Sequence, residues 1–232
     1  MASKNSVKQY AADSFYHIYN RGVEKRNIFI DSQDYAVFLS YLKTYLSLKD
    51  EKRLFKILSD SKSSPSDKDK ALKLLKLKNY CSQVQLISYA LLPNHFHLLL
   101  RQKDTVLDAF MNSVGTRYAM YFNRKYRRKG VLFQDVYKAV LVNSDEQLLH
   151  LSRYIHLNPV RASGLSVEHW EKVSFPCSLP EYLGKRQTLW IAKEYILDYF
   201  SKVNLQATYE NFLGLPFEAE PIQDIAIDLE DD

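Results

Sequence analysis

Cysteine is scarce in this chain of 232 residues, which contains only Cys81 and Cys177. Two cysteines cannot form the disulfide framework of a small secreted domain, and their spacing excludes a CxxC metal knuckle. The first residues lack the apolar core of a signal peptide, and no apolar run approaches the roughly 18 residues of a membrane span. These absences exclude secreted and membrane classes. They predict a protein of the reducing cytoplasm with no membrane partner.

Acidic residues are almost missing from one short region, where basic residues gather. Between Arg117 and Lys138 seven side chains are Lys or Arg and one is acidic. Six aromatic residues interleave with these bases, as in proteins that hold single-stranded nucleic acid between phosphate contacts and stacking rings. A solvated basic loop is the alternative interpretation. At the other extreme, residues 218–232 contain seven acids and no base.

Helical and strand patterns alternate along the chain. Residues 14–20 and 82–101 are rich in β-formers, and Pro93-Asn94 predicts a tight turn between two strands of a hairpin. Apolar spacing predicts helices over residues 31–46, 105–124 and 144–158, and over 187–203. Pro159 should end or bend the third of these at residues 157–158. We therefore expect an α+β fold with a central antiparallel sheet.

His95 and His97 are the sharpest chemical signal in the sequence. Side chains alternate between the faces of a strand, so both imidazoles share one face and can converge on a cation. Two half-buried histidines in a strand are the alternative. Tyr154 and Asn158 lie four residues apart on one helix face, where a tyrosine hydroxyl can act as a nucleophile and an amide oxygen as a further metal ligand. A core tyrosine is the plainer interpretation, since the chain has 17 tyrosines.

Several segments together resemble the single-tyrosine HUH transposases, in particular the REP-associated tyrosine transposases. They are Tyr16-His17-Ile18-Tyr19-Asn20-Arg21-Gly22, Leu91-Leu92-Pro93-Asn94-His95-Phe96-His97-Leu98-Leu99, Thr116–Arg124, Gly130–Gln134 and Ser152–Ala162. The segments run in family order and cover roughly residues 14–165. Two features depart from the family pattern, a long basic insert at about residues 49–78 and the acidic tail.

The resemblance implies a ferredoxin-like core with helices on one face of the sheet. It divides the chain into a transposase domain (1–165, with a helical hairpin inserted at about 49–78), a C-terminal helical extension (166–216) and an acidic tail (217–232) expected to be poorly ordered. It implies that His95, His97 and Asn158 bind Mg²⁺ or Mn²⁺ and that Tyr154 is the nucleophile. The residues expected to contact DNA are Arg21, Arg117, Tyr118, Arg124, Arg127, Arg128, Lys129, Phe133 and Arg161.

The function expected from this resemblance is cleavage and rejoining of single-stranded DNA near hairpins through a 5′-phosphotyrosine intermediate. A domesticated protein that binds hairpins without cutting is the first alternative. An unrelated metal hydrolase, which has no use for Tyr154, is the second. A histidine near the tyrosine, His150 or His156, can accept the phenolic proton or can simply be a packing residue. Both a monomer and a homodimer are compatible with the sequence.

Overall fold

Four antiparallel strands form the centre of the molecule. The computed structural model describes residues 10–200, 208–216 and 220–223. Strands β1 (Ser14–Arg21), β2 (Val84–Leu92), β3 (His95–Gln102) and β4 (Lys138–Val142) pair in the order β2-β3-β1-β4. Three α-helices lie between β1 and β2 and one lies between β3 and β4, and this strand order is that of the ferredoxin-like arrangement. The predicted α+β class with a central antiparallel sheet is confirmed.

The turn between β2 and β3 is held by the segment that follows β1. The backbone N–H of Gly22 donates to the Asn94 carbonyl at 2.8 Å, and those of Ile28 and Phe29 donate to the Pro93 carbonyl at 2.7 and 2.9 Å. Gly22 leaves no room for a side chain, because a Cβ there would lie 2.2 Å from the Arg26 carbonyl oxygen. The segment after β1 therefore holds the turn that leads into β3.

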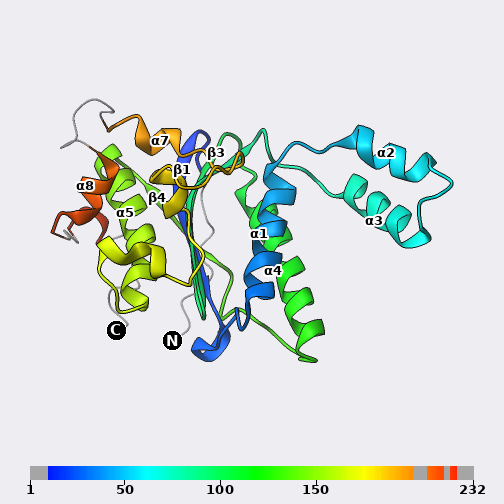
Figure 1. Ribbon diagram of the computed structural model, residues 1–232, viewed down its shortest axis with the longest axis horizontal. Helices are drawn as coiled ribbons and strands as arrows, with labels where there is room; N and C mark the ends of the chain where they lie inside the picture. Colours follow the sequence, from blue (N-terminus) through cyan, green and yellow to red (C-terminus); the bar gives the residue numbers. More distant parts are fainter. Residues whose placement is uncertain (1–9, 201–207, 217–219, 224–232) are drawn as a thin grey trace.

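Helices α1 (Ser32–Leu46) and α4 (Leu107–Lys125) cover one face of the sheet (Figure 1). Asp31 caps α1 through a capping box with Asp34, which satisfies backbone groups that a helix start leaves without partners. The core on this face is rich in aromatic rings, and Phe38 packs edge-to-face against Tyr118 at 5.1 Å between ring centroids. A short 3₁₀ turn, η1 (Val23–Lys25), connects β1 to this layer.

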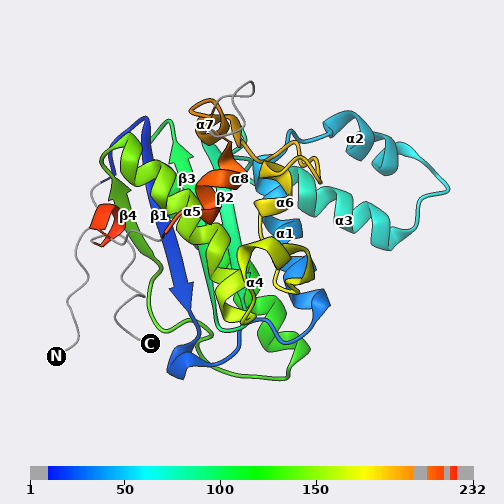
Figure 2. The same cartoon turned by 60° about the vertical axis from the view of Figure 1, so that its left-hand side comes forward.

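Helix α5 (Asp145–Ala162) covers the opposite face, which corrects the expectation that the helices lie on one face only. The physical reason is that β2 and β3 bury side chains on both of their faces, so each face needs a cover. Figure 2 shows α5 crossing the sheet from the end where β1 begins to the end where β3 begins.

Pro159 does not end α5, which continues to Ala162 and corrects the predicted end at residues 157–158. Proline removes one backbone hydrogen bond, but Pro159 lies in the last turn and is buried together with Val160. Backbone bonds from Ser163 to the Pro159 carbonyl and from Leu165 to the Val160 carbonyl close the end of the helix. Gly164 takes a positive φ of 65°, which a helix C-terminus of this kind favours.

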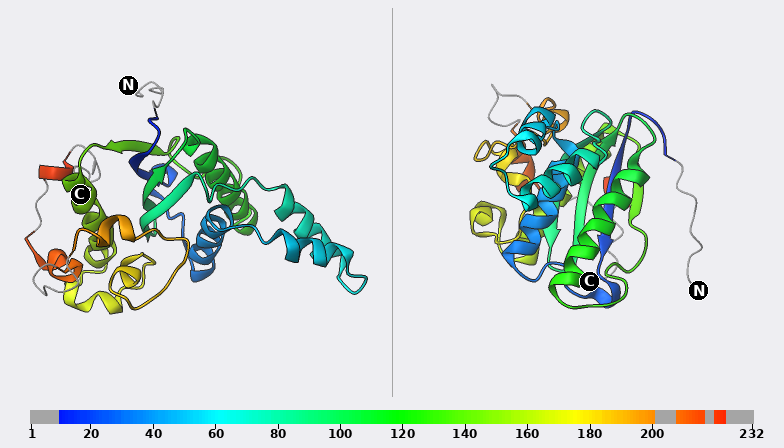
Figure 3. Two further views of the ribbon diagram at one scale, coloured as in Figure 1. Left: turned by 90° about the horizontal axis from the view of Figure 1, so that it is seen from above. Right: turned by 90° about the vertical axis from the view of Figure 1, so that its right-hand side faces the viewer.

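The predicted helical insert forms an arm of two antiparallel helices, α2 (Glu51–Ser59) and α3 (Pro65–Lys76). The arm projects away from the sheet and its helical layers (Figures 1 and 3). Each of its helices buries a single side chain, Leu54 in α2 and Ala71 in α3. The arm thus contributes little to the core of the molecule.

Short helices follow α5 and pack on it. They are η2 (Val167–Lys172), α6 (Leu179–Tyr182), α7 (Glu194–Leu197), α8 (Tyr209–Gly214) and η4 (Glu220–Ile222). Within the described residues the helix predicted over 187–203 is reduced to Glu194–Leu197. The division at residue 165 stays a prediction, and the residues after it share a hydrophobic cluster with α5. Most of the acidic tail lies outside the described residues.

Across the part of the chain that the structure describes, no helix has both the length and the apolar character required to cross a membrane.

Candidate active site

His95 and His97 stand at the start of β3, directly after the braced turn, and their side chains face α5. Phe96 between them faces the other way and packs against Phe38 of α1 at 5.1 Å between ring centroids. The rings of His95 and His97 are 5.0 Å apart and perpendicular. His97 is fully buried, whereas His95 is half-buried. The strand alternation therefore places the two imidazoles together as the sequence predicts.

Strand β1 adds two more rings to this face. Tyr19 is paired with His97 in the register of the sheet, and His17 lies two residues before it on the same face. A hydrogen bond of 2.9 Å joins His17 Nε2 to His97 Nδ1, and the two rings are stacked at 5.1 Å. Tyr19 stacks on His97 at 6.0 Å. The His97 imidazole is thus enclosed by the side chains of β1.

Tyr154 approaches this cluster from α5. Its ring meets those of His97 and His17 edge-on, at 5.6 and 6.3 Å between centroids. The side chain is 2% exposed, so the helix and the sheet are closed over the tyrosine in this conformation. The motif segments of β3 and α5, which are separate in the sequence, are thereby brought into contact.

Asn158 and Arg161 follow Tyr154 along α5. The helix runs toward the end of the sheet where β3 begins (Figure 2). Asn158 lies one helical turn, about 5.4 Å, beyond Tyr154. It is partly buried, and its Nδ2 has no hydrogen-bond partner among the described residues. Partial burial lowers the pKa of the Arg161 guanidinium, and the nearby Tyr154 acts in the opposite direction. A positive charge therefore lies close to the tyrosine.

Burial controls the protonation of the histidines. Burial, together with the imidazoles of His95 and His17, holds the pKa of His97 well below its usual range, so that its ring is neutral. His156 is also buried and neutral, with a pKa lowered to about 3 by burial. Its two nitrogens bond to Tyr209 and Ser178, which marks it as a packing histidine. His150 packs on Phe212, 5.3 Å between ring centroids.

The predicted metal ligands form a small donor set. Among the described residues, no group of three or more His, Cys, Asp or Glu side chains is arranged to hold a metal ion. His95 and His97 supply two imidazole nitrogen donors, and the Asn158 amide, with its buried Nδ2 lacking a partner among the described residues, supplies an oxygen on the facing helix. Two imidazoles and an amide suit a borderline divalent ion such as Mn²⁺, with other positions left for oxygen ligands. The residues present fit the ion that the sequence implies.

The predicted DNA contacts fall into an exposed group and an enclosed group. Arg124, Arg127 and Lys129 are exposed at the end of α4 and in the loop after it, and Arg161 is exposed on α5. Arg21 lies directly across from His95 in the sheet, and its Nε donates to Gln134 Oε1 at 2.6 Å. Arg21 therefore sits beside the histidine pair, which residue order alone does not reveal.

The enclosed group includes one wrong prediction. Tyr118 is fully buried between α1 and α4, and its hydroxyl donates to the Ile28 carbonyl at 2.6 Å, so its ring cannot stack on DNA. It lies on the apolar stripe of α4, which the helical spacing itself assigns to the core. Arg117 lies over the Tyr41 ring at 4.0 Å, and Arg128 lies near Phe122 at 5.7 Å. Phe133 is half-buried and contacts Phe96 edge-on at 6.0 Å.

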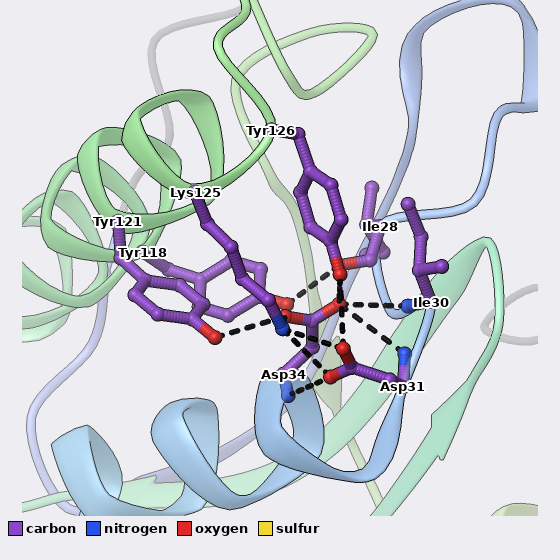
Figure 4. Close-up of polar contacts among 8 residues, drawn as sticks. All are labelled: Ile28, Ile30, Asp31, Asp34, Tyr118, Tyr121, Lys125 and Tyr126. Atoms are coloured by element: carbon purple, nitrogen blue, oxygen red, sulfur yellow. Dashed lines mark hydrogen bonds and ion pairs between the residues drawn. The ribbon is translucent and has the colours of Figure 1, made fainter.

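A network around Asp34 ties the basic loop to α1 (Figure 4). The buried carboxylate accepts hydrogen bonds from Tyr121, Lys125 and Tyr126 at 2.9, 2.7 and 2.7 Å. Lys125 also pairs with Asp31 at 2.7 Å. Lys125 is thus engaged inside the protein, while its neighbours Arg124 and Arg127 remain exposed.

A cavity of about 450 Å³ borders the same loop on the α4 side of the sheet. Phe96, Phe133 and the small residues Gly115 and Ala119 line it, and Asn20 and Gln134 add polar groups. Gln134 is the residue that holds Arg21, so the cavity adjoins the end of the sheet where the histidine pair lies. An aromatic hollow thus opens next to the exposed bases.

The comparison with known families bears directly on this arrangement. The profile of the family described as "Transposase IS200 like" matches residues 62–158, a segment that contains His95, His97, Tyr154 and Asn158. The match shows a similarity to the IS200-like transposases over 97 of the 232 residues. The family resemblance seen in the sequence is confirmed. No curated protein matches the chain.

Two solved structures are similar to this chain to different degrees. The structure of a REP-associated tyrosine transposase bound to a REP hairpin is similar with a TM-score of 0.50 and 11% sequence identity, covering 78% of this chain and 86% of that one. A structure described as a transposase of Deinococcus radiodurans R1 has a TM-score of 0.35 and 12% identity, covering 66% of this chain and 95% of that one. At this identity, the first likeness shows the shared fold.

His17 and Tyr19 lie beside the histidine pair, and the sequence alone does not assign them to the site. Both belong to the Tyr16–Gly22 segment that carries the resemblance. The sequence of one strand does not show which of its faces lies against the site, because this depends on its pairing with a neighbouring strand. Their alternate spacing places them on one face, as it does for His95 and His97. The antiparallel register between β1 and β3 then brings the two pairs together.

Proposed function

We propose that this protein cleaves and rejoins single-stranded DNA near hairpins, with Tyr154 as the attacking group. The observation that carries the proposal is the meeting of Tyr154 with His97 and His17 across the gap between α5 and the sheet. A tyrosine hydroxyl can form a covalent intermediate when a neighbouring base or a metal ion activates it.

His95, His97 and Asn158 are the proposed ligands of Mn²⁺ or Mg²⁺. Two imidazoles favour Mn²⁺ on ligand softness, although Mg²⁺ is the more oxygen-seeking ion. When bound, such an ion polarises the scissile phosphate and offsets the charge that develops on its oxygens. Arg21, beside His95, and Arg161, beside Tyr154, add positive charge at the same end of the sheet.

In the proposed reaction, the Tyr154 hydroxyl oxygen attacks the phosphorus and forms a phosphate ester with the 5′ side of the break. The P–O3′ bond breaks, and the leaving oxygen takes up a proton to become a free 3′-hydroxyl. Attack by a second 3′-hydroxyl reverses or redirects the step and returns the proton to Tyr154. The positive charge of Arg161 favours the tyrosinate during attack. One phosphodiester replaces another, so no nucleotide hydrolysis is required.

The DNA has to reach a tyrosine that is 2% exposed, so binding must open the contact between α5 and the sheet. The exposed bases Arg124, Arg127 and Lys129 are the proposed phosphate contacts, and Arg128, Arg117 and Phe133 are secondary ones because they are partly enclosed. The related structure that holds a REP hairpin supports a hairpin as the partner. Two free cysteines support a reducing cytoplasm as the location.

A covalent-trapping gel tests the proposal. End-labelled hairpin oligonucleotides with single-stranded flanks are incubated with the protein and Mn²⁺ or Mg²⁺, then separated under denaturing conditions. We expect a labelled band at the mass of protein plus DNA, absent in Tyr154→Phe. Tyr182→Phe is the matched control, because Tyr182 is a buried tyrosine of the same hydrophobic cluster that bonds to the Ile87 carbonyl instead.

Each alternative gives a different gel. Tight hairpin binding with no adduct under either metal favours a domesticated binding protein. Cleavage that persists in Tyr154→Phe and leaves a 5′-phosphate favours a metal hydrolase. Either result overturns the proposed nucleophile.

A further inference from the structure

The two histidines of the pair each bond through the same ring nitrogen. His95 Nδ1 lies 2.6 Å from Asn94 Oδ1, and His97 Nδ1 lies 2.9 Å from His17 Nε2. A hydrogen-bonded nitrogen cannot also coordinate a metal, so any ion must bind both residues through Nε2. A shared orientation of this kind is typical of ligating histidines, whose second nitrogen is bonded to an outer group.

The partner of each Nδ1 decides where the ring proton sits. An amide oxygen can only accept, so His95 Nδ1 carries a hydrogen, and Nε2 is the nitrogen that can coordinate a metal ion. The partner of His97 is another imidazole, which can either accept or donate. If His17 donates, the hydrogen of His97 moves to Nε2 and the ligand is lost. The tautomer of His17 thus governs whether His97 can bind.

We propose that His17 is a positioning residue that accepts a hydrogen bond from His97 Nδ1 and thereby presents His97 Nε2 to the catalytic metal ion. This inference rests on the metal site of the proposed function and adds to it a residue outside the ligand set. It explains why a histidine, rather than the aliphatic residue typical of a core strand, faces α5 at this position of β1.

Burial and packing make this contact selective. His17 and His97 are 1% and 0% exposed, so no water competes strongly for the hydrogen bond. The stacked rings, 18° apart in plane, and the β1–β3 register hold both side chains in place. His17 therefore restricts both the orientation and the tautomer of His97.

Two substitutions at residue 17 separate the hydrogen bond from the packing. His17→Leu fills a similar space without an acceptor, whereas His17→Gln offers an amide oxygen near the position of Nε2. Mn²⁺ binding to the full chain is measured by electron paramagnetic resonance, without DNA. We expect His17→Leu to weaken Mn²⁺ binding about 10- to 100-fold. His17→Gln should restore most of the affinity. His156→Gln changes a buried histidine outside the site and should leave the affinity unchanged.

The ring proton itself is followed in the metal-free protein with ¹⁵N-labelled histidine. Nitrogen chemical shifts should place the His97 hydrogen on Nδ1 in the wild type and in His17→Gln, and distribute it over both nitrogens in His17→Leu. A purely structural role for His17 changes the melting temperature of all variants but not this pattern.

The outcomes distinguish the inference from the proposal on which it rests. A His17→Leu protein that binds Mn²⁺ as tightly as the wild type, or keeps the wild-type tautomer, overturns the role of His17. A folded wild type that binds no Mn²⁺ overturns the metal site of the proposed function, and the positioning role with it.

Discussion

The two faces of the sheet differ in what they bury. The face under α1 and α4 holds mainly aromatic and aliphatic side chains, including Phe38, Phe96 and Phe110. The face under α5 buries polar groups as well, among them His17 and His97, and α5 itself buries His156. The difference shows that a single strand can supply both core packing and candidate site residues, since successive residues of β3 point to opposite faces. Stability is concentrated on one side and the candidate chemistry on the other.

The largest effect is expected on the aromatic face. Phe38→Ala removes a fully buried ring that contacts Phe29, Phe96 and Tyr118. We expect the free energy of unfolding to fall by about 3–5 kcal/mol, measured by urea denaturation. Molecules that remain folded should bind Mn²⁺ as the wild type does. If Phe38→Ala loses metal binding but keeps its stability, the two faces do not differ in the way described.

Asp34 is the exception on the aromatic face, since it is a buried charge at the edge of that layer. Burial alone would raise the pKa of its carboxyl, but the hydrogen bonds from Lys125, Ile30 and Tyr126 hold it below its usual range. Asp34→Asn should cost about 3 kcal/mol at neutral pH, because Lys125 loses its buried partner. A lowered pKa stabilises the fold above about pH 4 and is lost as the pH falls further. Unfolding curves of the two proteins should therefore converge in acid.

On the α5 side, stability should depend on pH in a higher range than that set by Asp34. His156 has a pKa of about 3 in the folded protein and about 6.5 when unfolded. Because the unfolded chain takes up the proton first, stability should fall between pH 6.5 and 5 by up to about 1.4 kcal/mol per pH unit. His156→Gln should show a shallower slope in that range. If the free energy of unfolding has the same slope against pH in the wild type and in His156→Gln, His156 does not cause this pH dependence.

The smallest effect on stability is expected at the exposed bases. Arg124→Ser and Lys129→Ser should leave the urea midpoint unchanged, because both side chains are exposed. Each should reduce the slope of log K against log salt for hairpin binding by about 1. Lys125 offers the contrast, since it is engaged with Asp31 and Asp34 and its loss should lower stability. A flat salt plot for the wild type would contradict the proposed phosphate contacts.

Much of the fold follows from local patterns in the sequence. The Pro93-Asn94 turn, the alternation through His95 and His97 and the apolar spacing of α1 and α4 all predict the observed elements. The failures arise where tertiary packing decides. Pro159 is tolerated because the end of α5 is buried and closed by further backbone bonds. Within the described residues, the segment 187–200 is mostly irregular, and Ile191 and Ala192 pair with Leu86 of β2.

The sequence indicates which elements carry the candidate site residues, but it does not indicate how closely these elements pack. Motif spacing indicates that Tyr154 and Asn158 share a helix face, yet no pattern within α5 reveals that His17 bonds to His97. That contact joins residues 80 positions apart and depends on the pairing of β1 with β3. Tyr118 is the opposite case. Its place within a basic segment suggests a contact with DNA, but its position on the apolar side of the helix assigns it to the core.

The placement of Tyr154 and Asn158 on a single helix has a mechanical consequence. The proposed attacking oxygen of Tyr154 and the proposed ligand Asn158 lie on α5, whereas His95 and His97 belong to β3. In the proposed reaction, opening the contact between α5 and the sheet admits the DNA, and closing it returns Tyr154 to the histidines. The packing of one helix on the sheet therefore controls access to the tyrosine.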